Sequence, residues 1–230
     1  MMRSELKAVL FDLDGTLIET APEISDAVND ALQAVDLDPV GLPMVRDWIG
    51  HGTATLLRSA LSYRLDMDAS ALEQWPLYPK AVQAFDTAYE ARCGSRSHLY
   101  DGVRETLAVL KANGIRLAVV TNKEARFTER VLQAHQLDSV MDMVISGDSL
   151  PTKKPHPGGI QHVMAQFQLA PEACLFVGDS SIDAATARAA GLTVWLLPYG
   201  YNMGQPLEAC EPDAILSEFG DVLAALDLDE

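Results

Sequence analysis

The chain has 230 residues, enough to bury one large hydrophobic core or a core with an inserted domain. Hydrophobic residues make up 48% of it and charged residues 22%, which is typical of a globular protein. The formal net charge of −16 at pH 7 argues against a nucleic-acid or anionic-membrane partner, because both need a basic surface. An anionic substrate would therefore need positive charge supplied locally at its binding site.

Features of targeting and redox chemistry point to the cytoplasm. The chain holds no run of about 18 apolar residues, so no transmembrane helix is predicted. Its first residues carry no apolar core of a signal peptide. Cys93, Cys174 and Cys210 lie far apart and form no C-x-x-C pair, as expected in a reducing compartment. We expect a cytoplasmic protein. The sequence does not indicate its oligomeric state.

The first predicted element is a strand at residues 8–11, a short apolar run that ends near the turn residue Gly15. From about residue 22 to residue 92 the apolar positions recur with helical spacing, uninterrupted by any buried-strand run. We interpret residues 18–97 as an inserted helical cap, joined at both ends by flexible segments. Residues 1–17 and 98–230 would form the catalytic core, over which such an insertion could close as a lid.

Strands and helices alternate in the rest of the chain. Apolar runs predict strands at residues 117–120, 143–145, 174–177 and 194–197. Helical patterns fall between or beside them, at residues 103–113, 125–135, 158–168 and 183–190. This alternation predicts βαβ units and an α/β fold, with a doubly wound, Rossmann-like parallel sheet.

Polar residues follow the predicted strands at four places along the chain. They are Asp12 with Asp14, Thr121 with Asn122, Lys154, and Asp179 with Asp183. Each alone has an ordinary structural explanation, such as a turn, a helix cap or a solvated loop charge. The carboxyl ends of parallel strands meet at the edge where α/β proteins bind their ligands. The four segments together therefore predict an active site.

In these four segments the chain resembles the haloacid-dehalogenase superfamily of phosphohydrolases. The matching motifs are residues 12–16, 121–122, 154 and 178–183, and the likeness spans nearly the whole chain. Within that superfamily the chain looks most like the phosphoglycolate phosphatases, through residues 10–17, 154–157 and 199–202. The resemblance implies hydrolysis of a small phosphate monoester, with 2-phosphoglycolate as the expected substrate and a sugar or amino-sugar phosphate as the alternative.

The resemblance also assigns roles to the phosphoryl-transfer residues. Asp12 would be the nucleophile that forms an aspartyl-phosphate, which divides one difficult step into two. Asp14 would protonate the leaving oxygen and then activate water. Thr121 and Asn122 would bind phosphoryl oxygens, and Lys154 would neutralise both the nucleophile and the developing charge.

Mg²⁺ is the expected cofactor, because it takes hard oxygen ligands and leaves room for water and a substrate phosphate. By resemblance its ligands would be Asp12, the main-chain carbonyl of Asp14, and Asp179. Asp183 would support the metal directly or through water. No other cofactor is implied.

Substrate recognition is expected to involve the cap. Its segment Gly50-His51-Gly52 resembles the glycine-containing substrate loop of this family. Arg46 and Arg58 are candidates to bind a substrate carboxylate, although a solvated surface role accounts equally well for each.

Two other classes of function stay open at this point. A phosphoacceptor signalling module also combines acidic residues, a Thr and a Lys on a parallel sheet, but it needs neither a lid nor the acid at Asp14. A catalytically idle binding protein would not need all four motifs intact. One departure from the family pattern is Glu19, where relatives often carry Asp, and we expect it to be a minor change at the hinge.

Overall fold

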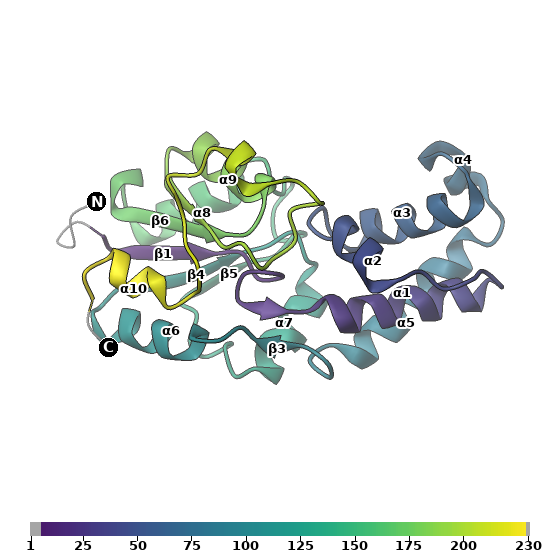
Figure 1. The fold of residues 1–230 in the computed structure, drawn as a ribbon, viewed down its shortest axis with the longest axis horizontal. Helices are drawn as coiled ribbons and strands as arrows, with labels where there is room; N and C mark the ends of the chain where they lie inside the picture. Colours follow the sequence, from purple (N-terminus) through teal and green to yellow (C-terminus); the bar gives the residue numbers. More distant parts are fainter. Residues whose placement is uncertain (1–5, 229–230) are drawn as a thin grey trace.

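The computed structural model describes residues 6–228, and its centre is a parallel sheet of six strands (Figure 1). The strand order is β5-β4-β1-β6-β7-β8. The bounds are β1 (Ala8–Phe11), β4 (Arg116–Val120), β5 (Met143–Ile145), β6 (Cys174–Gly178), β7 (Thr193–Leu196) and β8 (Ala214–Ile215). The predicted doubly wound α/β fold is thereby confirmed.

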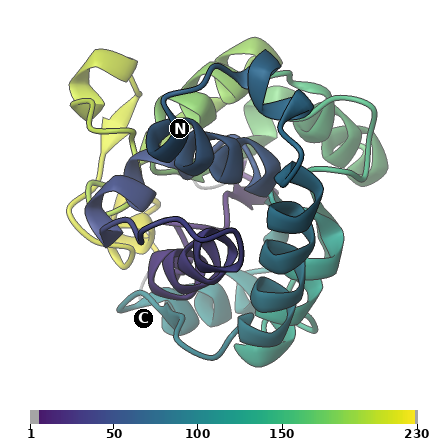
Figure 2. The ribbon, with the colours of Figure 1, turned by 90° about the vertical axis from the view of Figure 1, so that its right-hand side faces the viewer.

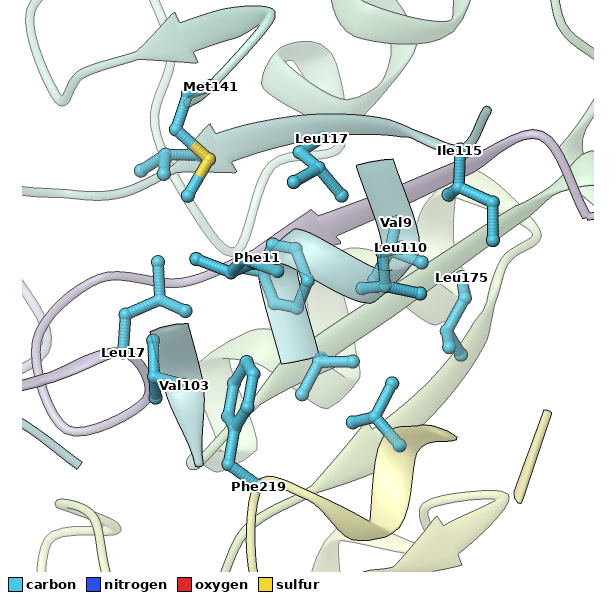
Figure 3. Close-up of a cluster of buried hydrophobic side chains, with 14 of the residues drawn as sticks. Val9, Phe11, Leu17, Val103, Leu110, Ile115, Leu117, Met141, Leu175 and Phe219 are labelled. Carbon is cyan, nitrogen blue, oxygen red and sulfur yellow. The ribbon is translucent and has the colours of Figure 1, made fainter. Parts of the chain in front are cut away.

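Helices cover both faces of this sheet. One face carries α6 (Val103–Ala112), α7 (Ala125–Ala134) and α10 (Asp221–Ala225), and the other carries α8 (Gly158–Phe167) and α9 (Ser181–Ala190). Side chains alternate along β1, as a strand buried on both faces requires. Val9 and Phe11 join the α6 side, where Phe219 packs on Phe11 (Figure 3). Ala8 and Leu10 join the α8 side.

A separate bundle of five helices lies beyond the carboxyl ends of the strands (Figures 1 and 2). It consists of α1 (Ala21–Ala34), α2 (Leu42–Trp48), α3 (Thr53–Leu65), α4 (Ala69–Gln74) and α5 (Tyr78–Arg92). The bundle has its own apolar core, in which Leu32, Leu61 and Phe85 are almost completely buried. No helix within residues 6–228 is long and apolar enough to cross a membrane.

The connections between the bundle and the sheet are packed, although their sequence suggested flexible joints. β2 (Ile18–Glu19) on the way in pairs antiparallel with β3 (His98–Leu99) on the way out. The carboxylate of Glu23 is fully buried and accepts the main-chain N–H groups of Gly94 (3.1 Å), Arg96 (3.2 Å) and Ser97 (3.1 Å). Those N–H groups would otherwise be unpaired, so Glu23 anchors the outgoing joint to α1.

Replacement of Leu32 by Ala tests the core of the helical bundle. Leu32 is completely buried, so Leu32→Ala should lower the free energy of unfolding by about 2–5 kcal/mol. Leu77 is 39% exposed, and Leu77→Ala should change it by about 0.5 kcal/mol or less. Urea unfolding measures both, and equal effects of the two substitutions would contradict this packing.

Candidate active site

The register of the sheet brings the predicted site residues to one edge. β1 lies between β4 and β6, with Phe11 level with both Val119 and Val177. The strands that follow β1 in the chain are added first on its β4 side and then on its β6 side. Open α/β sheets form a ligand crevice where the strand order reverses in this way. The polar residues one or two positions past that level are Asp12, Thr121 and Asp179.

Three buried carboxylates meet at this edge. Asp12, Asp179 and Asp183 each offer an oxygen within 4.8 Å of the others. The Lys154 ammonium joins two of them, with Nζ 2.8 Å from Asp12 Oδ1 and 2.7 Å from Asp183 Oδ1. Thr16 donates its hydroxyl to Asp179 at 2.5 Å. The first, third and fourth motifs therefore converge through direct contacts.

Burial and mutual repulsion shift the pKa values in this cluster. Burial raises the pKa of Asp12 to about 7; Lys154 opposes that shift, and Asp183 adds to it. Burial, together with the charges of Asp183 and Asp12, also raises the pKa of Asp179 well above its usual range. Burial disfavours the Lys154 ammonium, but Asp12 and Asp183 outweigh it and raise the pKa of that group. The cluster therefore holds more negative charge than its own lysine offsets.

Asp183 joins the site to the helix that follows it. Its Oδ2 accepts the N–H groups of Asp179 (3.1 Å) and Ser180 (3.1 Å) and the Ser180 hydroxyl (2.8 Å). Ser180 in turn caps α9 by accepting the Asp183 N–H, which completes a capping box. Asp183 Oδ1 is left for Lys154, so the helix start fixes the position of that ammonium group.

The second carboxylate of the first motif has different partners. Asp14 Oδ1 accepts hydrogen bonds from Lys123 Nζ and from the Thr20 hydroxyl, each at 2.6 Å. It is not one of the three clustered carboxylates, so any contribution of Asp14 to a metal would come from its main chain, as expected by resemblance. Within residues 6–228, no hydrogen bond is made to its other oxygen, Oδ2.

A small cavity of about 30 Å³ opens between this edge and the helical bundle. The core contributes Asp12, Asp14, Thr121, Asn122, Lys123, Asp179, Ser180 and Tyr201, and the bundle contributes Ile24, Ile49, Gly50, Gly52, Thr53 and Leu56. Gly50 and Gly52 thus lie where the sequence predicted a substrate loop, while His51, between them, is exposed and does not line the cavity.

The two arginines proposed as carboxylate ligands lie outside this cavity. Arg46 pairs with Glu19 at 2.7 Å. Arg58 contacts the Tyr78 hydroxyl at 3.1 Å and Glu73 at 3.1 Å. Both guanidinium groups therefore already have partners within the chain.

The glycine-containing loop contacts the core through hydrogen bonds. The Asn122 amide donates both to the Gly50 carbonyl and to the Lys154 carbonyl, each at 2.9 Å. Lys153 Nζ donates to the His51 carbonyl at 2.7 Å. Gly52 sits between them with φ +90°, and a Cβ there would be 2.9 Å from the Asn122 carbonyl oxygen. The loop therefore rests on Asn122 of the second motif and on Lys153, the residue before the third motif.

Glu19 has more partners than the sequence analysis expected. Its carboxylate, almost fully buried, accepts the hydroxyl hydrogens of Tyr201 (2.6 Å) and Tyr100 (3.0 Å) and pairs with Arg46. Tyr201 also donates its main-chain N–H to Asp179 at 2.6 Å. One network therefore connects helix α2 of the bundle with the carboxylate cluster.

Five residues of this environment had no assigned role in the sequence: Thr16, Glu19, Thr20, Lys123 and Tyr201. Three of them carried a usable signal. Thr16 and Tyr201 lie within segments that carry the family resemblance, and Lys123 directly follows the second motif. Thr20 and Glu19 gave none. Thr20 contacts Asp14 only because of how the chain folds between them, and the tyrosine partners of Glu19 lie 81 and 182 residues away.

The residues present fit a hard divalent cation. Their donor atoms are carboxylate oxygens, which suit such ions, and the three clustered carboxylates are buried close together. Four carboxylates at this edge face only two lysine ammonium groups, which leaves a formal charge of −2 when all are ionised.

Comparison with known proteins agrees with this geometry. A family model described as haloacid dehalogenase-like hydrolase matches residues 9–197. The chain is 39% identical to a phosphoglycolate phosphatase of Photobacterium profundum, over 97% of this chain and 96% of the relative. It is 40% identical to a phosphoglycolate phosphatase of Nitrosospira multiformis, over 92% of this chain and 91% of the relative.

Solved structures show the same fold. A predicted phosphoglycolate phosphatase from Haemophilus somnus superposes with a TM-score of 0.90 at 34% identity, covering 96% of this chain and 98% of that one. The protein CbbY from Rhodobacter sphaeroides, solved in complex with phosphate, gives 0.77 at 25% identity, with 97% and 100% covered. With its motifs joined at one sheet edge, this chain belongs to the haloacid dehalogenase-like hydrolase family.

Proposed function

We propose that this protein is a Mg²⁺-dependent phosphatase that hydrolyses 2-phosphoglycolate to glycolate and phosphate through an aspartyl-phosphate on Asp12. The contact that carries the proposal is Lys154 Nζ at 2.8 Å from Asp12 Oδ1, and Asp12 lines the small cavity. The relatives named phosphoglycolate phosphatase support the choice of substrate.

Asp12 is suited to attack phosphorus. Its Oδ1 is occupied by Lys154 and by the N–H of Leu13 at 2.7 Å, which fixes the orientation of the carboxylate. A fixed nucleophile lowers the entropic cost of reaching the transition state. The Lys154 charge also reduces the repulsion between Asp12 and an anionic ester.

Asp14 is suited to move the proton. Lys123 and Thr20 hold its Oδ1, while Oδ2 remains available beside the cavity. A carboxylic acid in this position can protonate the leaving oxygen, and the resulting carboxylate can then take a proton from the water that hydrolyses the aspartyl-phosphate. This pair of steps is what separates a phosphatase from a stable phosphoacceptor module.

Thr121 and Asn122 are suited to bind the phosphoryl oxygens. The Thr121 hydroxyl oxygen accepts the N–H of Lys123 at 3.2 Å, so its hydrogen is free to point toward a phosphoryl oxygen. Asn122 uses its side chain to hold the loop at Gly50, which leaves its main chain to line the cavity. Donors fixed in this way need little reorganisation as charge develops.

We assign the metal to Mg²⁺, held by Asp12, Asp179 and the Asp14 main-chain carbonyl. When bound, it would neutralise charge on the phosphoryl group and help to orient it. Asp183 contributes through Lys154 and helix α9, to which its two oxygens are hydrogen-bonded.

We further propose that residues 18–97 form a cap that opens to admit substrate. The contacts of Asn122 with Gly50 and of Lys153 with His51 would break on opening. Tyr89 of α5 packs on Phe127 of α7 with ring centres 4.6 Å apart and ring planes tilted by 44°, and this apolar contact would act as the pivot. Closure excludes water and completes the site.

The proposed reaction is tested by phosphate release from a panel of monoesters with Mg²⁺ present. The wild type should release phosphate steadily and show its highest kcat/KM for 2-phosphoglycolate. Asp12→Asn should lose on the order of 10³-fold or more in kcat while it keeps its circular dichroism spectrum. A sugar phosphate preferred by tenfold would overturn the substrate, and near-normal turnover by Asp12→Asn would overturn the covalent step.

The pKa of Asp12 predicts how metal binding depends on pH. With a pKa of about 7 in the folded metal-free protein and 3.8 as its ordinary value, Asp12 binds an extra proton on folding between those values. The stability of the metal-free protein should therefore fall as pH rises from about 4 to 7. Mg²⁺ favours the ionised form, so the gain in Tm on adding Mg²⁺ should be larger at about pH 8 than at about pH 5.

Differential scanning fluorimetry in EDTA and in MgCl₂ measures that gain. Asp12→Asn removes one of the two carboxylates whose pKa is raised, so it should reduce the pH dependence of the Tm measured in EDTA. An equal Mg²⁺-induced gain at both pH values in the wild type would contradict the prediction.

Gly52→Ala tests closure of the cap, with Gly114→Ala as its matched control. Both glycines have positive φ, +90° and +75°, so both substitutions carry a similar backbone cost. Only at Gly52 would the new Cβ strike the core, whereas nothing lies within 4 Å at Gly114. We expect Gly52→Ala to lower kcat/KM at least tenfold and Gly114→Ala to leave it within about twofold. Similar values for the two variants would count against closure at this loop.

A further inference from the structure

Lys123 is the one lysine or arginine that lines the cavity in the part of the chain the structure describes. Away from the carboxylate cluster the cavity wall is apolar, formed by Ile24, Ile49 and Leu56. An anionic leaving group placed there would find a single cation within reach. Neither Arg46 nor Arg58 lines this wall, and both already have acidic partners.

The Lys123 ammonium is deeply buried and has few partners. Its side chain is 1% exposed, and Nζ lies 2.6 Å from Asp14 Oδ1 and 5.0 Å from the centre of the Tyr89 ring. Within residues 6–228 that contact with Asp14 is the only hydrogen bond made by Nζ, although an ammonium carries three N–H donors. Burial of a charge is costly unless its hydrogen bonds are made, so Lys123 has donor capacity left for a ligand.

The position of Lys123 suits a compact acid. Asp14 is the group proposed to protonate the ester oxygen, and Lys123 touches the same carboxylate. In a two-carbon hydroxy acid the carboxylate carbon is only two bonds from that oxygen. A leaving group of this kind can therefore meet Asp14 with its ester oxygen and Lys123 with its carboxylate at once.

We propose that Lys123 Nζ binds the carboxylate of the substrate's leaving group and thereby selects phosphate esters of small hydroxy acids. The proposal deepens the phosphatase function and rests on it. Lys123 would have two roles, binding the substrate carboxylate and holding Asp14. Thr20 shares only the second role, because its hydroxyl also donates to Asp14. This division of roles gives the test its control.

The test compares matched pairs of esters that differ in leaving-group charge. The pairs are 2-phosphoglycolate with ethyl phosphate, and 3-phosphoglycerate with glycerol 3-phosphate. Lys123→Met should lower kcat/KM for the acid of each pair about a hundredfold more than for its neutral partner, because a buried charge pair is lost. Thr20→Val removes the other hydrogen bond to Asp14 without changing charge, and it should lower both members of a pair equally.

Product inhibition provides a second readout. Glycolate should inhibit the wild type, and its inhibition constant should rise at least tenfold in Lys123→Met, whereas that of inorganic phosphate should change little. If Lys123→Met is too unstable to assay, Lys123→Gln, which keeps a polar side chain, should show the same discrimination. Equal losses for acidic and neutral esters, with unchanged glycolate inhibition, would show that Lys123 only positions Asp14.

The test also separates failure of this proposal from failure of the substrate assignment. If the wild type hydrolyses 3-phosphoglycerate but not 2-phosphoglycolate, the assigned substrate is wrong. The comparison of 3-phosphoglycerate with glycerol 3-phosphate then still tests the role of Lys123. If both acids are hydrolysed and Lys123→Met leaves the acid-to-neutral ratio unchanged, the phosphatase stands and the specificity role is overturned.

Discussion

The buried ammonium of Lys154 is the contact on which the rest of the site depends. It lies within 2.8 Å of Asp12 and 2.7 Å of Asp183, so it joins the proposed nucleophile to the first turn of α9. A carboxylate buried without a partner would take up a proton instead of remaining charged. Even with Lys154 present, burial and the charge of Asp183 raise the pKa of Asp12 to about 7, and the four carboxylates at this edge face only two lysines. A divalent cation would supply the missing positive charge, and with it the site of a protein of net charge −16 would attract an anionic ester.

The helical bundle is connected to this cluster at three places of different character. Glu23 anchors the outgoing joint, Glu19 links α2 to Tyr201 beside Asp179, and Asn122 holds the loop at Gly50. The first contact is made by a fully buried carboxylate and would persist in an open form. The last is made across the cavity and would break. Closure in this account therefore changes the loop contacts near the phosphoryl site while it leaves the joints intact.

Much of the fold followed from the sequence, because β1 and its neighbours are short apolar runs buried on both faces and each is followed by a helix with clear periodicity. The motif residues were predictable for the same reason, since strand ends of a parallel sheet meet at one edge. The partners of Asp14 were not predictable. Lys123 lies 109 residues from Asp14 in the sequence. From the sequence alone it is indistinguishable from an exposed loop lysine, and only the structure shows that it is buried. The partners of Glu19 were not predictable either, because the two tyrosines lie 81 and 182 residues away.

The central claim is that Asp12 becomes phosphorylated during turnover, and trapping that species tests it most directly. Enzyme mixed with phosphoryl-labelled substrate and Mg²⁺ would be quenched in acid within the first turnover and its bound label counted. A second sample, made with unlabelled substrate, would be reduced with tritiated borohydride, which releases the phosphate and leaves tritium on the residue identified by sequencing. The account predicts label on Asp12, reduction of that residue to homoserine, and no label in Asp12→Asn. Label on any other residue, or phosphate release with no labelled enzyme at any time point, would contradict it.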